Sequence, residues 1–413
     1  MLTFRVENSP SLKAFLLAGV LALVFESLAC GGRIVKETEA MPVDNQQKPA
    51  LETTVPTWLG NPNRSFYGTG PLSTGPMKVV WQFKTKTITG RWHDDPWGGT
   101  SWPGQPSADE RYVYFPSADG NLYCLDVADG SLNWSFKAED SLKSTPTLAG
   151  DRLVVSGLDH YLYCLNRRNG DLIWKFKSGF EIDGTSSIID GRVYFGSEDG
   201  FYYCLNLEDG ALIYKTKNLG SMEGSSTIVD DRIYVGTEQG DLFCLNRADG
   251  SIVWKARTNA DSDSTPAVAN GLVYTAAENG LVYCFTQLDG KLVWTFKATG
   301  GTTKDKSGFW ASPIIADGKL FIGSSNASMY CLSSDKGELI WQWRGRMPIW
   351  GTAPVVDGRI VFGDKGGTLH QLSVKDGRSL SDLKIGENIN STPVILGGRI
   401  YIGAFNGNLY CVN

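Results

Sequence analysis

The sequence predicts an all-β protein, a single eight-bladed β-propeller of four-stranded antiparallel blades whose last blade is completed by an outer strand from the N-terminal part of the chain. Three observations predict this fold: a repeat of about forty residues, four short strand patterns within each repeat, and an incomplete repeat at each end of the chain. A fixed period of this length is typical of folds in which each unit packs mainly against its neighbours.

The repeat has two markers, a Cys in the segment LYCL and a Trp ten residues after it. The first marker occurs eight times, at steps of 40 residues with a single step of 47. Its positions are Cys124, Cys164, Cys204, Cys244, Cys284, Cys331, Gln371 and Cys411. The positions of the second marker are Trp134, Trp174, Tyr214, Trp254, Trp294, Trp341 and Ser381, with Trp81 standing upstream in VVWQFK. Eight copies in register indicate eight equivalent units.

Each unit is predicted to contain four short strands. In residues 145–177 the candidate strands are TPTLA, RLVVSG, YLYCLN and DLIWKFK, each bounded by turn residues. The third turn is Asp129-Gly130 in the first unit and Asn169-Gly170 in the second, and such pairs accept the positive φ of tight hairpin turns. Because segments such as RIYVG are apolar at consecutive positions, both faces of each sheet are expected to be buried. Sheets stacked in a ring achieve this without exposed end units.

The two incomplete repeats predict how the ring closes. The last unit stops at Asn413, two residues after its Cys, and lacks an outer strand. The segment around Trp81 supplies that strand, so the two ends of the chain are expected to share the eighth blade. Closure of this kind pairs edges that would otherwise invite aggregation. An open solenoid is the alternative architecture, but it has no use for an isolated fourth strand.

The N-terminal part carries targeting signals. Arg5 and Lys13 precede an apolar run at residues 14–25, which is too short to cross a bilayer and suits a signal peptide at residues 1–29. The following SLAC resembles a bacterial lipobox, so Cys30 is expected to be lipidated, although ordinary cleavage or an uncleaved anchor stays open. Residues 30–57 are expected to be a flexible tether and residues 58–413 the propeller. We therefore expect a lipid-anchored protein of the bacterial envelope, on the periplasmic face of the outer membrane.

Composition excludes several classes of partner. The chain has a net charge of −5 and no basic patch, so a nucleic acid is not an expected partner. The three His residues lie far apart without the ligand spacing of a zinc site. A closed repeat array can hold residues 58–413 as one domain, which we expect to be monomeric.

The repeat resembles a known family. CLDVADGSLNW is similar to the tryptophan-docking motif AxDxxTGxxxW of the quinoprotein (PQQ-type) propellers, with Cys124 in place of Ala and Asp129 in place of Thr. The resemblance covers residues 58–413 and is weakest at 371–381. It implies that the outer-strand Trp residues pack between blades, where Trp→Ala costs about 3–5 kcal/mol. The residues that match this structural role are Trp81, Trp134, Trp174, Trp254, Trp294 and Trp341.

The same resemblance bears on activity. Quinoprotein dehydrogenases of this type carry an adjacent Cys-Cys pair, a calcium site and a catalytic Asp on long loops. This chain has no such pair, its blades are short, and we find no positions for catalytic, metal-binding or PQQ-binding residues. The chain looks more like the non-catalytic sub-family, which includes the lipoprotein scaffold subunit of the outer-membrane β-barrel assembly machinery. A PQQ-dependent dehydrogenase and a small-molecule or sugar-binding propeller remain the alternatives.

The Cys marker is expected to be structural. Strand spacing of ~4.8 Å places equivalent Cys residues of adjacent blades ~13 Å apart, beyond the ~7 Å limit for a disulfide. The Cys residues are therefore expected to be small buried hydrophobes.

One face of the ring is the candidate binding face. Antiparallel order puts the second-to-third-strand turns and the blade connections on the same face, and both length insertions fall there. Aromatic and basic residues gather at the entries to blades 1, 6 and 7, and acidic residues on the opposite arc. The candidate residues are Trp92, Trp97, Trp102, Phe309, Trp310, Arg346, Trp350, Asp183, Glu223, Asp261 and Asp263. We predict a polarised mouth that binds an extended peptide or another envelope protein. Alternatively, the Trp residues plug the central channel and the carboxylates are solvated turn residues, or the cluster holds a sugar ring.

Overall fold

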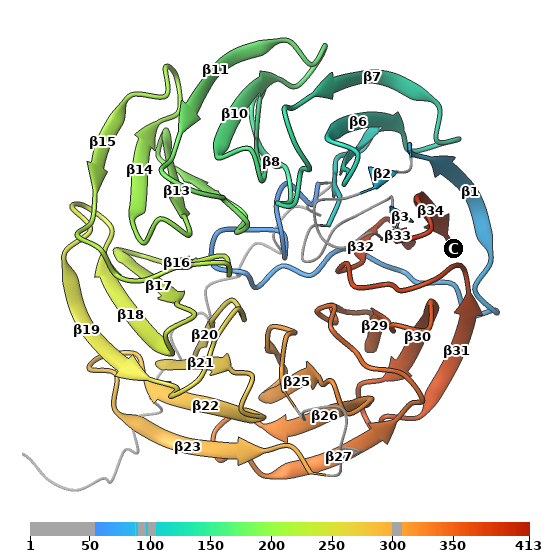
Figure 1. Cartoon of the computed structure of the whole chain (residues 1–413). Helices are drawn as coiled ribbons and strands as arrows, with labels where there is room; N and C mark the ends of the chain where they lie inside the picture. Colours follow the sequence, from blue (N-terminus) through green and yellow to red (C-terminus); the bar gives the residue numbers. More distant parts are fainter. Residues whose placement is uncertain (1–53, 87, 90–95, 98–104, 300–307) are drawn as a thin grey trace, which may run out of the picture. The chain divides into compact units, whose positions relative to one another are not determined.

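A computed structural model describes residues 54–86, 88–89, 96–97, 105–299 and 308–413 of the chain. In it, eight four-stranded antiparallel sheets stand around a common axis, which confirms the predicted eight-bladed β-propeller (Figure 1). The described residues contain no helix, and therefore none that is long and apolar enough to span a membrane. Cys30 and the predicted signal peptide lie outside the described residues.

The strands follow the repeat. Blade 1 contains β4 (Ser107–Ala108), β5 (Tyr112–Pro116), β6 (Asn121–Asp126) and β7 (Leu132–Lys137). Blade 2 contains β8 (Thr147–Ala149), β9 (Arg152–Ser156), β10 (Tyr161–Asn166) and β11 (Leu172–Lys177). Blade 3 contains β12 (Ser187–Ile189), β13 (Arg192–Gly196), β14 (Tyr202–Asn206) and β15 (Leu212–Lys215). Blade 4 contains β16 (Thr227–Val229), β17 (Arg232–Gly236), β18 (Asp241–Asn246) and β19 (Ile252–Arg257).

The second half of the ring repeats the pattern. Blade 5 contains β20 (Ala267–Ala269), β21 (Leu272–Ala276), β22 (Leu281–Thr286) and β23 (Leu292–Lys297). Blade 6 contains β24 (Ile314–Ala316), β25 (Lys319–Gly323), β26 (Ser328–Ser333) and β27 (Leu339–Arg344). Blade 7 contains β28 (Val355–Val356), β29 (Arg359–Gly363), β30 (Thr368–Ser373) and β31 (Ser379–Lys384). Blade 8 contains β32 (Val394–Leu396), β33 (Arg399–Ala404), β34 (Asn408–Val412) and β1 (Val79–Lys84), and β2 (Ile88–Thr89) pairs with β3 (Pro96–Trp97) between blades 8 and 1.

The ring closes as the sequence predicts. β1 pairs with β34 in antiparallel register, with Trp81 opposite Cys411. The backbone N–H of Asn413 donates to the carbonyl of Lys78 at 3.1 Å. Figure 1 shows the blue β1 beside the red β34, so the two parts of the chain share one blade.

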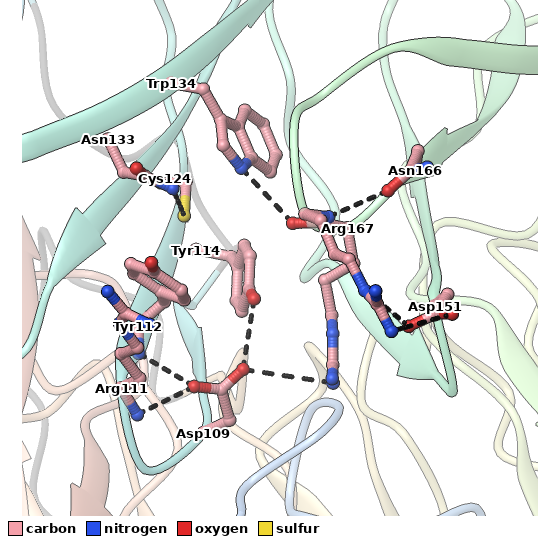
Figure 2. A network of polar contacts seen from close by, with 11 residues as sticks. Asp109, Arg111, Tyr112, Tyr114, Cys124, Asn133, Trp134, Asp151, Asn166 and Arg167 are labelled. Carbon is pink, nitrogen blue, oxygen red and sulfur yellow. Dashed lines mark hydrogen bonds and ion pairs between the residues drawn. The ribbon is translucent and has the colours of Figure 1, made fainter.

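The outer-strand aromatic residues dock on the following blade. In blade 2, Cys164 pairs with Trp174 and Leu165 with Leu172, so Ile173 forms a β-bulge beside the buried indole. In Figure 2, Trp134 Nε1 donates to the carbonyl of Arg167 at 3.2 Å. Trp81, Trp174, Trp254, Trp294 and Trp341 each donate to a carbonyl of the next blade.

Figure 2 also shows how this seam is reinforced by polar groups. Asp109 accepts a hydrogen bond from the Tyr114 hydroxyl at 3.0 Å, and its other oxygen accepts the backbone N–H of Tyr112 at 2.7 Å. The Arg167 guanidinium lies 3.8 Å from the Asp109 carboxylate. One Arg residue of blade 2 therefore contacts both the docked Trp134 and an acidic turn residue of blade 1.

The match to the repeat is weakest where the incoming chain passes. Blade 8 has no turn between β34 and β1, because these strands come from opposite ends of the chain. Ser381 stands at the docking position of blade 7, and its hydroxyl accepts the N–H of the buried Met77 at 3.1 Å. Gln371, in the Cys position, accepts a hydrogen bond from Arg359, which also donates to the carbonyl of Ser73. Both departures from the repeat thus accommodate residues 73–77.

The segment Val55–Leu72, here called the channel segment, crosses the centre of the ring (Figure 1). Val55 pairs with Ala108 of blade 1, and the carbonyl of Pro62 accepts the N–H of Ile228 of blade 4 at 2.9 Å. The Tyr67 hydroxyl donates to the carbonyl of Ile315 of blade 6 at 2.9 Å. Residues 55–57, which the sequence analysis assigns to the tether, are thus the first residues of the channel segment. This segment therefore occupies the centre of the ring, in contact with the inner strands of several blades.

Arg64 fastens the channel segment. Its side chain is fully buried and makes five hydrogen bonds, which include the carbonyls of Ser226 at 3.1 Å and Trp58 at 2.8 Å and the hydroxyl of Ser187 at 3.0 Å. Burial lowers the pKa of Arg64 to about 10, which leaves it charged at neutral pH. A guanidinium can be buried in this way because its planar set of donors is satisfied by fixed acceptors.

The seven Cys residues in the described part of the chain are free and buried. Desolvation raises the pKa of the thiol of Cys124 to about 12 and that of Cys164 to about 11. Thiols with such pKa values carry almost no thiolate at neutral pH, so they behave as small core hydrophobes.

Candidate binding face at the channel mouth

The second-to-third-strand turns and the blade connections lie on one face, here called the mouth face. The carboxylate of Asp159, in such a turn, accepts the N–H of Glu139 from a blade connection at 3.0 Å. Asp199 of the next blade likewise accepts the N–H of Gly179 at 2.7 Å. The sequence prediction that these segments share a face therefore agrees with the contacts.

Each blade connection contributes one residue to a ring around the channel mouth. Successive connections are joined by hydrogen bonds in register, such as Thr145 N–H to Thr185 Oγ1 at 3.1 Å and Thr185 N–H to Ser225 Oγ at 2.8 Å. The residue two positions before each such hydroxyl residue is equivalent in every blade. The described members of this mouth ring are Lys143, Asp183, Glu223, Asp263, Trp310, Trp350 and Asn390.

Blades 2 and 3 form a charged part of the ring. Asp183 is 1 % exposed, and one of its oxygens contacts the ammonium of Lys143. Although desolvation works against it, the charges of Asp183 and Glu223 raise the pKa of Lys143. One carboxylate oxygen from each of Glu181, Asp183 and Glu198 lies within 4.8 Å of the others. Desolvation, followed by the neighbouring carboxylates, raises the pKa of Glu198 to about 8.

Blades 4 and 5 form a second acidic part. Oxygens of Asp261, Asp263 and Glu278 lie within 4.8 Å of one another. Desolvation first, and then the charges of Glu223 and Asp261, raise the pKa of Asp263 to about 10. Desolvation also raises the pKa of Glu223 to about 7. The raised pKa values favour the protonated forms of these carboxyl groups near neutral pH, and an approaching cation favours their ionisation.

Blades 6 and 7 form the aromatic part. The rings of Trp310 and Trp350 are stacked, with centroids 5.2 Å apart and planes inclined by 24°. Trp350 Nε1 donates to the hydroxyl of Ser325 at 3.1 Å, and the ammonium of Lys365 lies 3.5 Å from the centroid of the Trp350 ring. Both indoles are partly exposed, so they offer apolar surface beside the acidic residues.

A small cavity lies beneath the ring. Its volume is about 20 Å³, and its walls include Asp263, Trp310, Trp350 and Asn390, with Trp58 of the channel segment at one side. Trp58 Nε1 donates to the hydroxyl of Thr392 at 3.3 Å. Asn390 is 3 % exposed, and among the described residues its Oδ1 has no hydrogen-bond partner. Asp263 Oδ1 is also buried and accepts no hydrogen bond from an N–H or hydroxyl group of the described residues.

The structure brings most of the candidate residues together. Trp310, Trp350, Asp183, Glu223 and Asp263 are members of the mouth ring, and Asp261 lies beside Asp263. Arg346 is exposed in the connection that leads to Trp350. Trp92 and Trp102 lie outside the described residues, and Trp97 is placed only by its backbone pairing with Ile88.

Phe309 does not lie on the binding face, so the sequence prediction for this residue is wrong. Its side chain is 1 % exposed and packs between blades 5 and 6, and its ring centroid lies 6.2 Å from that of Tyr330. The physical reason is alternation: the residue before each mouth-ring position points into the core. The equivalent buried residues are Leu142, Ile182, Met222, Ser262, Ile349 and Ile389.

Sequence reasoning missed Asn390 and the floor residue Trp58. Alignment of the repeats would have found Asn390, because it stands in the same column as Asp183 and Trp350. Trp58 belongs to the non-repeating channel segment, so the repeat carries no signal for it.

Comparisons with known proteins agree with this architecture. Residues 147–413 match the family described as the β-propeller of the beta-alanine-activating enzyme. No curated protein sequence matches the chain. The crystal structure of BamB from Moraxella catarrhalis is similar with a TM-score of 0.63 and 17% identity, over 80% of this chain and 97% of that one.

Two dehydrogenases share the fold as well. A europium-containing methanol dehydrogenase has a TM-score of 0.74 and 13% identity, over 87% of this chain and 98% of that one. A quinohemoprotein alcohol dehydrogenase from Comamonas testosteroni has a TM-score of 0.73 and 12% identity, over 87% of this chain and 80% of that one. At these identities the likeness shows a common fold. The match over residues 147–413 shows the family, and the chain belongs to the β-propeller family of the beta-alanine-activating enzyme, with the PQQ-like propeller fold that its repeats predict.

Proposed function

We propose that the protein is a non-catalytic, lipid-anchored scaffold of the bacterial cell envelope that binds an extended peptide, or an extended segment of another protein, on its mouth face. The observation that carries this proposal is the stacked pair Trp310–Trp350 beside the acidic residues of the same ring. Partly exposed aromatic side chains are common anchors of protein interfaces, and charges around them steer the partner.

The position of the channel segment supports binding at the mouth face. The channel segment fills the centre of the ring, and Trp58 forms part of the floor beneath the Trp pair. The mouth is therefore a shallow cup with a small cavity of about 20 Å³ at its base. Such a shape suits a chain that lies across the face and inserts a side chain, because most small-molecule sites are several hundred Å³ in volume.

The charge of the mouth argues against a PQQ site. PQQ is a planar quinone that carries carboxylates, and carboxyl groups of blades 3 to 5, such as Asp183, Glu223 and Asp263, line one side of the mouth. Like charges in a partly buried site repel. These residues do not fit PQQ, so we assign the protein no reaction step through that cofactor.

The envelope location rests on the N-terminal sequence. The apolar run at residues 14–25 followed by Cys30 favours export and lipidation. We extend the proposal to a role in outer-membrane protein assembly because the repeats resemble the scaffold sub-family of the PQQ-type propellers, and BamB of Moraxella catarrhalis shares the propeller fold. Metabolic labelling with a clickable fatty acid tests the anchor: label is expected on the wild type and is expected to be lost in Cys30→Ser.

Binding is tested with an array of overlapping peptides from envelope proteins, probed with the full chain. Trp350→Ala is expected to lose most of the bound peptides. Leu288→Ala, which removes an exposed apolar side chain from the turn between β22 and β23 on the opposite face, is the control and should keep them. Equal binding by the two variants would argue against the mouth face. Dye-linked alcohol oxidation after addition of PQQ and calcium would overturn the non-catalytic assignment.

A further inference from the structure

Two of the residues that line the cavity beneath the mouth ring have buried hydrogen-bond acceptor oxygens. Asp263 Oδ1 and Asn390 Oδ1 are buried, and neither accepts a hydrogen bond from an N–H or hydroxyl group of the described residues; the Asp263 carboxyl group contacts that of Asp261 instead. A buried acceptor without a donor is costly and rare in folded proteins. Asn390 is a separate observation from the acidic cluster, because its amide oxygen is uncharged and comes from blade 8. Both residues line the same cavity, and their acceptor oxygens indicate that a donor group belongs there.

The remaining walls restrict the charge of that donor. Trp310 and Trp350 border the same cavity. The faces of indole rings attract cations, and a carboxylate beside them adds direct charge complementarity. A group that satisfies two acceptors, a carboxylate charge and two indoles is an organic cation with several N–H donors.

The size of the cavity further restricts which donor group can enter it. A volume of about 20 Å³ holds about one water molecule. An ammonium group is of that size and carries three donors, whereas the planar guanidinium of Arg is larger. The cavity therefore fits the tip of a lysine side chain better than the tip of an arginine side chain.

The ring already contains one contact of this kind. The ammonium of Lys143 contacts the carboxylate of Asp183, the next member of the mouth ring. A ring carboxylate thus accepts a lysine ammonium within the protein itself. Asp263 stands in the equivalent position two blades further on, where the preceding member of the ring is Glu223 rather than a lysine.

We propose that the mouth ring receives the ammonium of a lysine side chain from the bound peptide, with Asp263, Asn390 and the Trp310–Trp350 pair as its contacts. This proposal rests on the proposed peptide-binding function and names the residue that the peptide inserts. The methylene carbons of the lysine pack on the exposed indole surface, while its ammonium replaces water in the cavity.

Binding of the cation is linked to protons. Because burial raises the pKa values of Glu223, Glu198 and Asp263 and so favours their protonated forms near neutral pH, binding of an ammonium releases protons. The affinity is therefore expected to rise between about pH 6 and about pH 9, where lysine itself stays charged. The titratable groups that face the mouth are Lys143, Glu181, Asp183, Glu198, Glu223, Glu238, Asp261, Asp263, Glu278 and Lys365.

The experiment measures binding of capped five-residue peptides to the full chain by calorimetry and by Trp fluorescence. The central residue is lysine, Nε-acetyl-lysine, arginine or norleucine, and free butylamine is a further probe. The lysine peptide is expected to bind at least about tenfold more tightly than the acetyl-lysine and norleucine peptides, since a lost charged contact of this kind costs at least one decade. Arginine is expected to bind more weakly than lysine.

Two variants assign the contact. Asp263→Asn and Asn390→Leu are each expected to weaken lysine binding at least about tenfold, whereas Glu208→Gln, an exposed carboxylate on another turn, should change it less than about twofold. Equal affinity for lysine and acetyl-lysine peptides overturns the proposal, and this comparison needs only the wild type. Butylamine that binds as tightly as the lysine peptide identifies a free-amine site and overturns the peptide source. If the array peptides that bind the protein are not enriched in lysine, this inference is wrong, whereas the proposed peptide-binding function stands.

Discussion

The indole of Trp134 lies directly against Gly170 of the following blade: a Cβ placed on Gly170 would stand 2.6 Å from Cε3 of the Trp134 ring. Gly170 also has a φ of +78°, which side-chain-bearing residues rarely adopt. The same pairing recurs around the ring, with Gly210 against Trp174 and Gly290 against Trp254. The Gly of the repeat is therefore a packing surface as well as a turn residue.

Gly170→Ala is expected to lower the free energy of unfolding by about 2–4 kcal/mol, because it combines left-handed strain with overpacking against Trp134. Gly191→Ala is the matched control, since its φ is +70° and an added Cβ would meet nothing within 4 Å. The control should lose only about 1 kcal/mol. Urea denaturation followed by Trp fluorescence measures both, and equal losses would show that the indole contact contributes little.

Ser381→Trp restores the repeat pattern but is expected to destabilise the protein. The position lies over Met77 rather than over a Gly, so an indole would overpack this seam by about 1–3 kcal/mol. Tyr214→Trp is the contrasting variant, because Tyr214 lies against Gly250 and donates to the Arg247 carbonyl as the Trp residues do at their seams. That change is expected to cost less than about 1.5 kcal/mol. A thermal melt in which Ser381→Trp is the more stable variant would contradict the packing described at the closure.

Removal of Arg64 is expected to loosen the channel segment. Arg64→Met leaves the carbonyls of Ser226 and Thr185 without their donor, at a cost of about 1–3 kcal/mol for each unsatisfied group. Arg64→Lys should recover only part of the loss, since lysine lacks the planar set of donors. Limited proteolysis is expected to cut within residues 55–72 faster in both variants than in the wild type, and unchanged cleavage would show that Arg64 is not what holds the segment.

His370 predicts a pH dependence of stability. Its two ring nitrogens lie 2.7 Å from Asp382 and 3.1 Å from Asp364. Although desolvation opposes it, hydrogen bonds to Asp364 and Asp382 raise the pKa of His370. A raised pKa in the folded state contributes stability that is present below the unfolded pKa of about 6.5 and is lost as the pH rises through the folded value.

The corresponding variant is His370→Tyr, because tyrosine occupies this position in most repeats. Wild type is expected to gain stability relative to the variant when the pH is lowered from about 9 to about 6, where the histidine becomes charged. Denaturation curves at both values give the difference. A difference in unfolding free energy that does not change with pH would show that His370 stays neutral in the fold.

The ring was predictable from the sequence because every blade repeats the same local pattern. Steps of 40 residues, the Asp-Gly and Asn-Gly turns and the split eighth unit each carry their own signal, and the pairing of Trp81 with Cys411 follows from them. The channel segment was not predictable in this way. Its contacts join residues far apart in the chain, such as Tyr67 and Ile315, and it has no second copy from which a pattern could be read.

The candidate face was predicted in outline and corrected in detail. The arcs of charged and aromatic residues follow from strand order alone, but exposure depends on which way each side chain points. Phe309 and Trp310 are neighbours in sequence, yet the first is in the core and the second on the mouth ring. An alignment of the eight connections separates the two columns, because the column of Phe309 is almost entirely apolar and that of Trp310 is mixed.

The pairing of β1 with β34 has a consequence for biogenesis. When the chain leaves the ribosome or a translocon with its N-terminal end first, β1 emerges before β34. It therefore stays unpaired until β34 has emerged. Until then the nascent array has two unsatisfied sheet edges that can be captured by holdase chaperones or by other chains. Emergence of β34, rather than formation of any single blade, is therefore the step that allows the ring to close.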